Sequence, residues 1–181
     1  MTSNEAELVR RWFEDSVLGL GLCPFAGDPW RAGRIRMVVT HAPTEHGLLA
    51  DLHAEFVRLE ETDPRELETT ILIVANWLED FDDFNQFLNL GDAIIDEFQW
   101  SGQFQLASFH PDYCFADTEP DDVSNLTNRS PYPLLHLLRE SSVSRAVNEH
   151  SDTSLIPEQN IATLAGLSEE RRRRIFHFLK D

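Results

Sequence analysis

The spacing of hydrophobic residues along the chain predicts several amphipathic helices. Over residues 4–20, apolar side chains recur every three to four positions, as on one face of an α-helix: Leu8, Val9, Trp12, Phe13, Val17 and Leu20. The same period returns over residues 45–60, over residues 81–98 and from about residue 168 onward. We therefore expect helices in these segments, and the sequence leaves open a break in the third one near Gly91.

Three short apolar runs between these helices predict β-strands, at residues 35–40, 69–76 and 103–109. The middle run, TTILIVAN, is apolar almost throughout, which is typical of a strand buried on both faces. The alternation of strands and helices predicts an α/β fold with a small, mostly parallel sheet of three or more strands. Because no repeat or shift in composition divides the 181 residues, we expect a single domain over 1–181, with helices covering both faces of the sheet.

A long polar segment, residues 110–131, follows the third expected strand. Long connections inside a compact domain usually bind or react with something, and polar groups on a loop held by a rigid scaffold are common in functional sites. After it, residues 132–149 are predicted to form a helix, with Ser130 as its N-cap and Pro131 in its first turn. A looser piece without a clear period is expected around Ile156 to Leu167.

The ends of the expected strands bring polar residues to one edge of the sheet. In an open parallel sheet, ligands bind outside the carboxyl ends of the strands. This edge would gather His41, Asn76, His110 and Asp112. Histidine titrates near neutral pH, so we expect His110 to transfer protons, with Asp112 orienting a histidine or holding a cation.

The expected helix start beside Asn128 and Arg129 would form an anion site. Backbone N–H groups at a helix start attract anions, and the guanidinium of Arg129 matches a carboxylate or a phosphate. Helical spacing would add a polar stripe that carries Tyr132, His136 and either Arg139 or Glu140. His136 would then be a second group for proton transfer, in one pocket with His110. The candidate substrate-binding residues are Asn128, Arg129, Ser130, Tyr132 and Arg139.

A structural interpretation of the same residues stays open. Ser130 and Pro131 fit an ordinary capped helix, and Arg129 would pair with Asp121 or Asp122 to fix the loop. His136 would be a core histidine whose ring is hydrogen-bonded to a carboxylate such as that of Asp112, since buried polar groups nearly always have partners.

Cys23 is the candidate nucleophile. If Pro24 begins a short helix, the helix start would favour the thiolate of Cys23. The alternative is a small residue packed at the end of the first helix. Only two cysteines, Cys23 and Cys114, are present, so no disulfide framework is expected and a reducing cytoplasm is the expected location.

A bound metal ion is a further hypothesis. Two sets of side chains could supply ligands, but neither has the spacing of a known metal motif. The loop carboxylates could also hold a divalent cation such as magnesium. The first set is His110, Asp112, Cys114 and Asp117, and the second is His41, His46 and His53.

Charge and hydropathy exclude some classes of partner. A net charge of −17 argues against nucleic-acid binding, which needs clustered Lys and Arg. The basic run at residues 171–174 follows two glutamates and fits an exposed helix face. No apolar run is long enough to span a bilayer, so we expect a soluble, acidic protein without a membrane partner.

Several segments resemble a known family. The resemblance is carried by GLCPF at 21–25, FHPDY at 109–113, TNRSPYP at 127–133 and LHLLRE at 135–140, and it covers most of the chain. The chain is similar to DUF1415, a mainly bacterial family known only as a domain of unknown function. The resemblance implies a site around these motifs and implies no reaction. It also implies that position 114 is usually not cysteine, which favours Cys23 over Cys114.

We therefore expect a small enzyme that acts on an anionic carboxylate or phosphate compound at the 110–140 segment. The alternative is a non-catalytic binding or partner-interaction protein that uses the same loop as a recognition surface. The two differ in geometry. An enzyme requires His110, Arg129 and His136 to converge on one open pocket, whereas a binding protein would have these residues spread apart or bonded to their neighbours.

Overall fold

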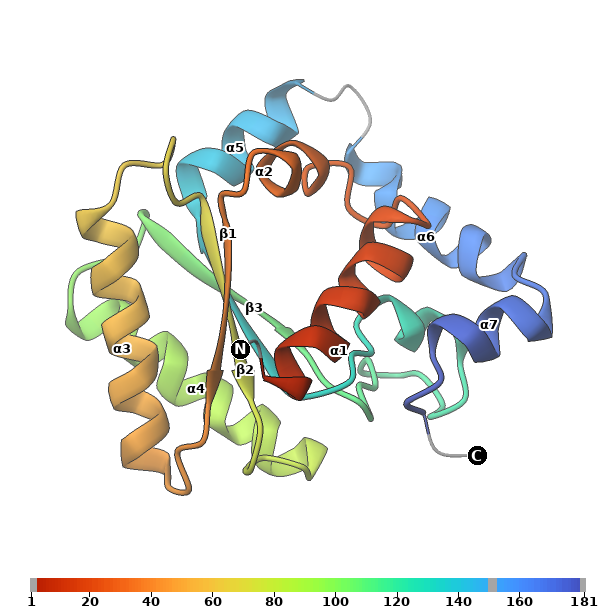
Figure 1. Cartoon of the computed structure of the whole chain (residues 1–181), viewed down its shortest axis with the longest axis horizontal. Helices are drawn as coiled ribbons and strands as arrows, with labels where there is room; N and C mark the ends of the chain where they lie inside the picture. The colour runs from red at the N-terminus through yellow and green to blue at the C-terminus, as the bar shows by residue number, and fades with distance from the viewer. Residues whose placement is uncertain (1–2, 150–152, 180–181) are drawn as a thin grey trace.

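The computed structural model describes residues 3–149 and 153–179, and it shows one mixed β-sheet flanked by helices (Figure 1). The sheet has four strands in the order β1-β2-β4-β3. β1 and β2 are parallel, whereas β4 is antiparallel to both of its neighbours, β2 and β3. The α/β prediction is confirmed, but the expected mostly parallel sheet is wrong. The strands are β1 Ile35–Thr40, β2 Thr69–Val74, β3 Phe104–Phe109 and β4 Leu134–Arg139.

β4 is the element that the sequence analysis missed. Its sequence, LLHLLR, was expected to begin a helix, but the helix α5 (Glu140–Glu149) starts only after the strand ends. A continuous apolar run fits a buried strand and a buried helix equally well, and here it fills the gap between β2 and β3. Ser130 is consequently not a helix N-cap, because its Oγ donates a hydrogen bond to the carbonyl oxygen of Tyr132 at 2.6 Å.

The expected helices are otherwise present. The first continues from α1 into a π-helical turn, η1, and α4 runs through Gly91 without a break. A Cβ at Gly91 would lie 2.8 Å from Cδ2 of Leu106 on β3, so glycine allows α4 to pack closely against the sheet. The remaining elements are α1 Asn4–Trp12, η1 Phe13–Leu18, α2 Gly27–Arg31, α3 Glu45–Glu61, α4 Phe81–Glu97, η2 Val123–Thr127, η3 Thr153–Leu155, α6 Ile156–Ala165 and α7 Glu169–Ile175.

The two faces of the sheet have different neighbours, and we name them the α3/α4 face and the α1 face. Figure 1 shows α3 and α4 together on one side of the strands and α1 on the other, with α6 and α7 beyond it. Strand register assigns alternate residues to each face. The α3/α4 face carries residues such as Leu72 and Leu135, whereas the α1 face carries Met37, Ile71 and His136.

The α3/α4 face holds the larger hydrophobic core. Leu48, Leu52, Phe56 and Leu59 of α3 are fully buried there, together with Phe84 of α4. Within residues 3–149 and 153–179, no helix is both long and apolar enough to cross a membrane.

Candidate functional site: a cavity beside the α1 face

A cavity of about 520 Å³ opens beside the α1 face, where three segments distant in sequence meet. One wall comes from η1 and the turn after it, a second from the end of β3 and the following loop, and a third from α6. The lining residues are Val17, Leu22, Cys23, Phe109, Phe115, Thr118, Ser124, Thr127, Asn128, Ile156, Pro157, Asn160 and Ile161.

Contacts behind the cavity hold its walls in place. The chain reverses after η1 at Gly21, whose positive φ of 67° suits glycine. The side chain of Asn160 on α6 donates a hydrogen bond to the carbonyl oxygen of Leu22 at 2.8 Å, which ties α6 to that turn. Buried Leu126 and Leu164 pack in one cluster with Leu22, so the loop, the helix and the turn form one unit.

The loop wall is built around Asn125, which is fully buried. Its Oδ1 accepts hydrogen bonds from the backbone N–H of Phe115 at 2.9 Å and from Oγ1 of Thr118 at 3.0 Å. Its Nδ2 donates to the carbonyl oxygen of Glu119 at 2.8 Å. The amide of Asn125 thus fixes the loop from inside, a role that the density of polar residues in this segment did not single out.

Arg129 closes the same loop. Its Nε donates to the carbonyl oxygen of Tyr113 at 3.2 Å, and Nη2 donates to that of Pro120 at 2.6 Å. The expected partners were Asp121 or Asp122, or a bound anion; the structure instead shows backbone carbonyl groups. Since the helix start expected at Pro131 is absent, the geometric basis of the proposed anion site is wrong.

Asn128 lies between the loop and the cavity. Its Nδ2 donates to the carbonyl oxygen of Ser108 at 3.1 Å, and its Oδ1 accepts from Oγ1 of Thr127 at the same distance. It is the one predicted substrate-binding residue that lines the cavity. Ser130 is buried nearby, and its N–H donates to the carbonyl oxygen of His110 at 3.4 Å.

His110 is a buried structural residue of the α3/α4 side. Its ring lies against the rings of Phe81 and Phe84, with centroids 5.3 and 5.1 Å away. Nδ1 accepts the backbone N–H of Asp112 at 3.0 Å, so Nε2 carries the proton and donates to the carbonyl oxygen of Leu78 at 3.0 Å. Burial lowers the pKa of His110, while the side chain of Asp112 is exposed.

His136 lies on the opposite face of the sheet. In β4 it is paired with Ile71 of β2 and Ala107 of β3, and its ring centroid is 6.3 Å from that of Phe109. Nε2 is enclosed and has no hydrogen-bond partner in the described chain, although the ring as a whole is partly accessible. Burial lowers the pKa of His136 to about 4, so the ring is neutral at pH 7. The structure therefore does not bring His110 and His136 together.

The polar stripe expected along a helix is divided by the strand. Tyr132 packs into the cluster on the α1 face. Arg139 is buried on the other face, where its Nη2 donates to the carbonyl oxygens of Leu59, Thr62 and Leu67 at 2.5, 2.8 and 3.1 Å. Arg139 thus links β4 to the end of α3 and to the segment that follows it.

Cys23 lines the cavity, but not at a helix start. Pro24 and Phe25 form a turn, and α2 begins only at Gly27. Burial raises the pKa of the Cys23 thiol, an effect only partly offset by hydrogen bonds from the backbone of Phe25 and Ala26. The expected lowering of its pKa is wrong, and its reactivity relative to Cys114 stays a prediction. Cys114 lies in the loop with Sγ 3.5 Å from the carbonyl oxygen of Thr118.

The predicted edge of strand ends is formed in part. Nδ2 of Asn76 and Nδ1 of His41 are 3.3 Å apart, as expected for residues that follow adjacent parallel strands. Throughout the described residues, no group of three or more His, Cys, Asp and Glu side chains could hold a metal ion. The divalent cation therefore stays a prediction.

Two residues that the sequence did not indicate as site residues lie near this region. Trp12 and Ser16 are buried, and neither the indole Nε1 nor the serine Oγ has a hydrogen-bond partner in the described chain. The sequence contains one indication for Ser16, because it is a polar residue between Phe13 and Val17 in the helical segment that faces the core. The α6 residues that line the cavity gave no such signal.

The comparison with protein families covers nearly the whole chain. The family model described as "Protein of unknown function (DUF1415)" matches residues 4–174, so the chain belongs to that family. No curated protein and no solved structure matches the chain.

Proposed function

We propose that this protein is a non-catalytic small-molecule-binding protein whose ligand is mainly apolar and occupies the cavity beside the α1 face. The volume of about 520 Å³ falls within the range of roughly 300–1,000 Å³ that is usual for ligand pockets. The observation that carries the proposal is the chemistry of the lining, which is apolar with a few neutral polar groups.

The lining gives an anion little to bind. Among the described residues that line the cavity, none is charged. Asn160 and Asn128 already donate hydrogen bonds to backbone carbonyl oxygens, and Thr127 donates one to the carbonyl oxygen of Ser124 at 2.7 Å. An anion in this cavity would lose its hydration without gaining a cation. The net charge of −17 adds long-range repulsion.

The catalytic hypothesis from the sequence required His110, Arg129 and His136 to converge. His110 and His136 are instead on opposite sides of the sheet, and Arg129 and His110 are hydrogen-bonded to neighbouring backbone groups. This spread favours the binding-protein alternative, in which the loop supplies a rigid wall. An enzyme acting on a carboxylate or phosphate compound stays the second hypothesis, with no observation that favours it.

Calorimetric titration with toluene tests the proposal. Ile156 lines the cavity, so Ile156→Trp should fill part of it and weaken toluene binding by at least about tenfold. Val147→Trp is the matched control, because it places the same side chain at an exposed apolar position of α5 outside the lining. Saturable binding to the wild type and the control, and weaker binding to Ile156→Trp, is expected. Absent binding to the wild type, or equal binding to both variants, would show that the cavity is not a ligand site.

A further inference from the structure

Six buried side-chain polar atoms have no hydrogen-bond partner in the part of the chain that the structure describes, and three of them lie on the α1 side. These three are Nε1 of Trp12, Oγ of Ser16 and Nε2 of His136. Trp12 and Ser16 are only 2% and 1% exposed, so bulk water does not reach their side chains. Leaving a buried donor or acceptor unpaired costs about 1–3 kcal/mol each, which makes three near one another a feature to explain.

These groups lie close to the cavity but do not line it. Phe109 lines the cavity, and the centroid of its ring is 5.5 Å from that of Trp12 and 6.3 Å from that of His136. Ser16 lies four residues after Trp12 and directly before Val17, which also lines the cavity. The ring of Phe109 therefore borders both the cavity and the rings of Trp12 and His136.

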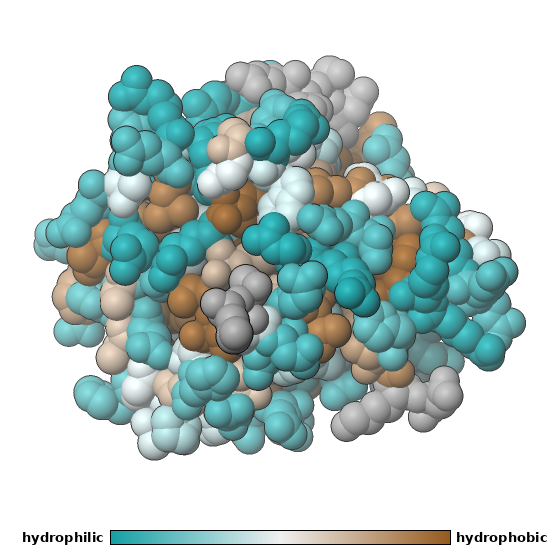
Figure 2. Space-filling view, viewed as in Figure 1, coloured by the Kyte–Doolittle hydropathy of each residue, from teal (hydrophilic) through white to brown (hydrophobic). Residues whose placement is uncertain are grey.

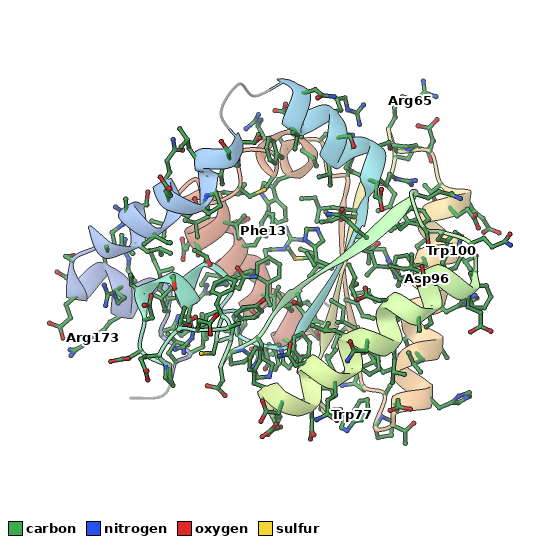
Figure 3. The ribbon with its side chains drawn as sticks, turned by 180° about the vertical axis from the view of Figure 1, so that it is seen from behind. Phe13, Arg65, Trp77, Asp96, Trp100 and Arg173 are labelled. Atoms are coloured by element: carbon green, nitrogen blue, oxygen red, sulfur yellow. The ribbon has the colours of Figure 1, made fainter. Side chains whose placement is uncertain are left out.

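The local backbone supports a functional interpretation. Ser16 lies in the π-helical turn η1, and such turns inside helices occur frequently at functional sites. Figure 3 shows Phe13 of the same turn on the α1 side of the sheet, opposite Trp100 on the α4 side. The turn follows Trp12 directly, so it sets the spacing between Trp12 and Ser16.

The donor and acceptor capacities of the three groups define what they can recognise. An indole N–H can only donate, a serine hydroxyl can donate or accept, and a neutral imidazole nitrogen can do either according to its tautomer. A hydroxyl group on a ligand could accept from Trp12 and donate to His136. A carboxylate could not donate, and no charged residue is among the cavity-lining residues that the structure describes to neutralise it or a phosphate.

We propose that the ring of Phe109 turns aside when a ligand enters the cavity, so that Trp12, Ser16 and His136 form the polar end of the ligand site and recognise an uncharged hydroxyl group on an otherwise apolar ligand. This inference rests on the proposed binding function and adds the class of ligand to it.

Matched ligand pairs test this inference separately from the proposed function. Toluene and p-cresol have the same apolar body and differ by one hydroxyl group, as do hexane and 1-hexanol. Dissociation constants would be measured for the wild type, Ser16→Ala and His136→Leu. The control is Thr70→Val, because Thr70 is fully buried with an equally unpaired Oγ1 but lies on the α3/α4 face.

We expect the wild type to bind p-cresol about fivefold more tightly than toluene, the ratio that one net hydrogen bond of about 1 kcal/mol gives. The preference should fall below about twofold in Ser16→Ala and His136→Leu, and it should be unchanged in Thr70→Val. The preference is a ratio measured within each protein, so it does not depend on an unchanged affinity for toluene, and cooperative urea unfolding of each variant shows that it is folded.

Each other result has a distinct meaning. If toluene binds but the wild type shows no preference for p-cresol, or if the preference survives both α1-face substitutions, the polar end is wrong and the cavity proposal stands. If Thr70→Val loses the preference as well, the effect is not specific to the α1 face and the inference is wrong. If neither member of either pair binds, both proposals are wrong.

Discussion

The two faces of the sheet are packed to different degrees. On the α3/α4 face, α3 and α4 bury a continuous cluster around Leu52, Phe56 and Leu72. On the α1 face, side chains such as Met37 and His136 stay partly accessible although α1 and η1 cover their neighbours. Figure 2 shows hydrophobic atoms reaching the surface among hydrophilic ones in the view of Figure 1.

Unpaired buried polar atoms occur on both faces of the sheet. On the α3/α4 face they are Oγ1 of Thr70 and Nε of Arg139, although Nη2 of Arg139 donates to three backbone carbonyl oxygens. On the α1 side they are Nε1 of Trp12, Oγ of Ser16 and Nε2 of His136, and this is the side on which the cavity opens. We infer that the larger core on the α3/α4 face supplies most of the stability and that the α1 face, beside the cavity, supplies the proposed binding function.

The largest expected effect compares one deletion on each face. Phe56→Ala should lower the free energy of unfolding by about 3–5 kcal/mol, because Phe56 is fully buried in the α3/α4 core. Met37→Ala on the α1 face should cost only about 1 kcal/mol, since Met37 is partly exposed. Urea denaturation followed by circular dichroism gives both values. Similar losses for the two variants would contradict the division between the faces.

Arg139→Leu tests whether this residue holds the fold or a substrate. Removing the guanidinium takes a donor from three carbonyl oxygens, of which that of Leu59 keeps the N–H of Thr62, and should cost about 3 kcal/mol of unfolding free energy. Arg65→Leu is the control, because Arg65 is exposed and its change should leave the free energy of unfolding nearly unchanged. Toluene affinity should stay the same in both folded variants. A stable Arg139→Leu protein would show that these hydrogen bonds do not hold β4 to α3.

The pH dependence of stability tests the enclosure of His136. Its pKa is lowered to about 4 in the folded protein, so between pH 6.5 and 4 the unfolded chain binds a proton that the folded chain does not. The folded protein therefore keeps the full contribution of His136 to its free energy of unfolding above pH 6.5. This contribution is lost as the pH falls toward 4. Because the ring is partly accessible, we expect a loss of about 2 kcal/mol rather than the full value of the shift.

Wild type and His136→Leu would be compared by denaturation at pH 7 and at pH 4.5. The variant should lose about 2 kcal/mol less than the wild type over this interval. His110, whose pKa is also lowered by burial, contributes to both proteins and cancels in the difference. Equal losses would show that His136 titrates normally and is not enclosed.

The smallest expected effect concerns the close packing of α4. Gly91→Ala would place a Cβ 2.8 Å from Cδ2 of Leu106 and 3.5 Å from Cδ2 of Leu52. Alanine favours a helix by about 1 kcal/mol over glycine, but the overlap in a packed core should cost about 1–3 kcal/mol, leaving a net loss near 1 kcal/mol. A rise in the melting temperature would show that the α3/α4 face has more room than its packing indicates.

Local patterns were sufficient to predict most elements of the fold. The run at 35–40 became β1 with the same bounds, and the helical periods over 45–60 and 81–98 became α3 and α4. The sequence LLHLLR at 134–139 was ambiguous, because a run that is apolar on both sides has no period that separates strand from helix. That one error placed Ser130 at a helix start and put His136 and Arg139 on one face.

The sequence indicated one wall of the candidate cavity, but not its other walls or the roles of its residues. The 110–131 segment does form a wall of the cavity, as its length and polarity indicated. The partners of Arg129 are the backbone carbonyl groups of Tyr113 and Pro120. Every residue has such a group, so the residue types in the sequence could not identify these partners. Cys23 was assigned a low pKa from an expected helix start, whereas the turn at Pro24 buries the thiol instead.

The indole N–H signals of the four tryptophans test the central claim most directly. Trp12 and Trp30 pack on the α1 side, and Trp77 and Trp100 pack on the α3/α4 side, so each face carries two reporters. In a ¹⁵N-labelled sample titrated with p-cresol, and with signals assigned by single Trp→Phe variants, we expect the Trp12 signal to move downfield as its Nε1 gains a hydrogen bond. The Trp77 and Trp100 signals should stay in place. A Trp12 signal that does not respond while p-cresol binds, or an equal response from Trp100, would contradict the assignment of binding to the α1 face.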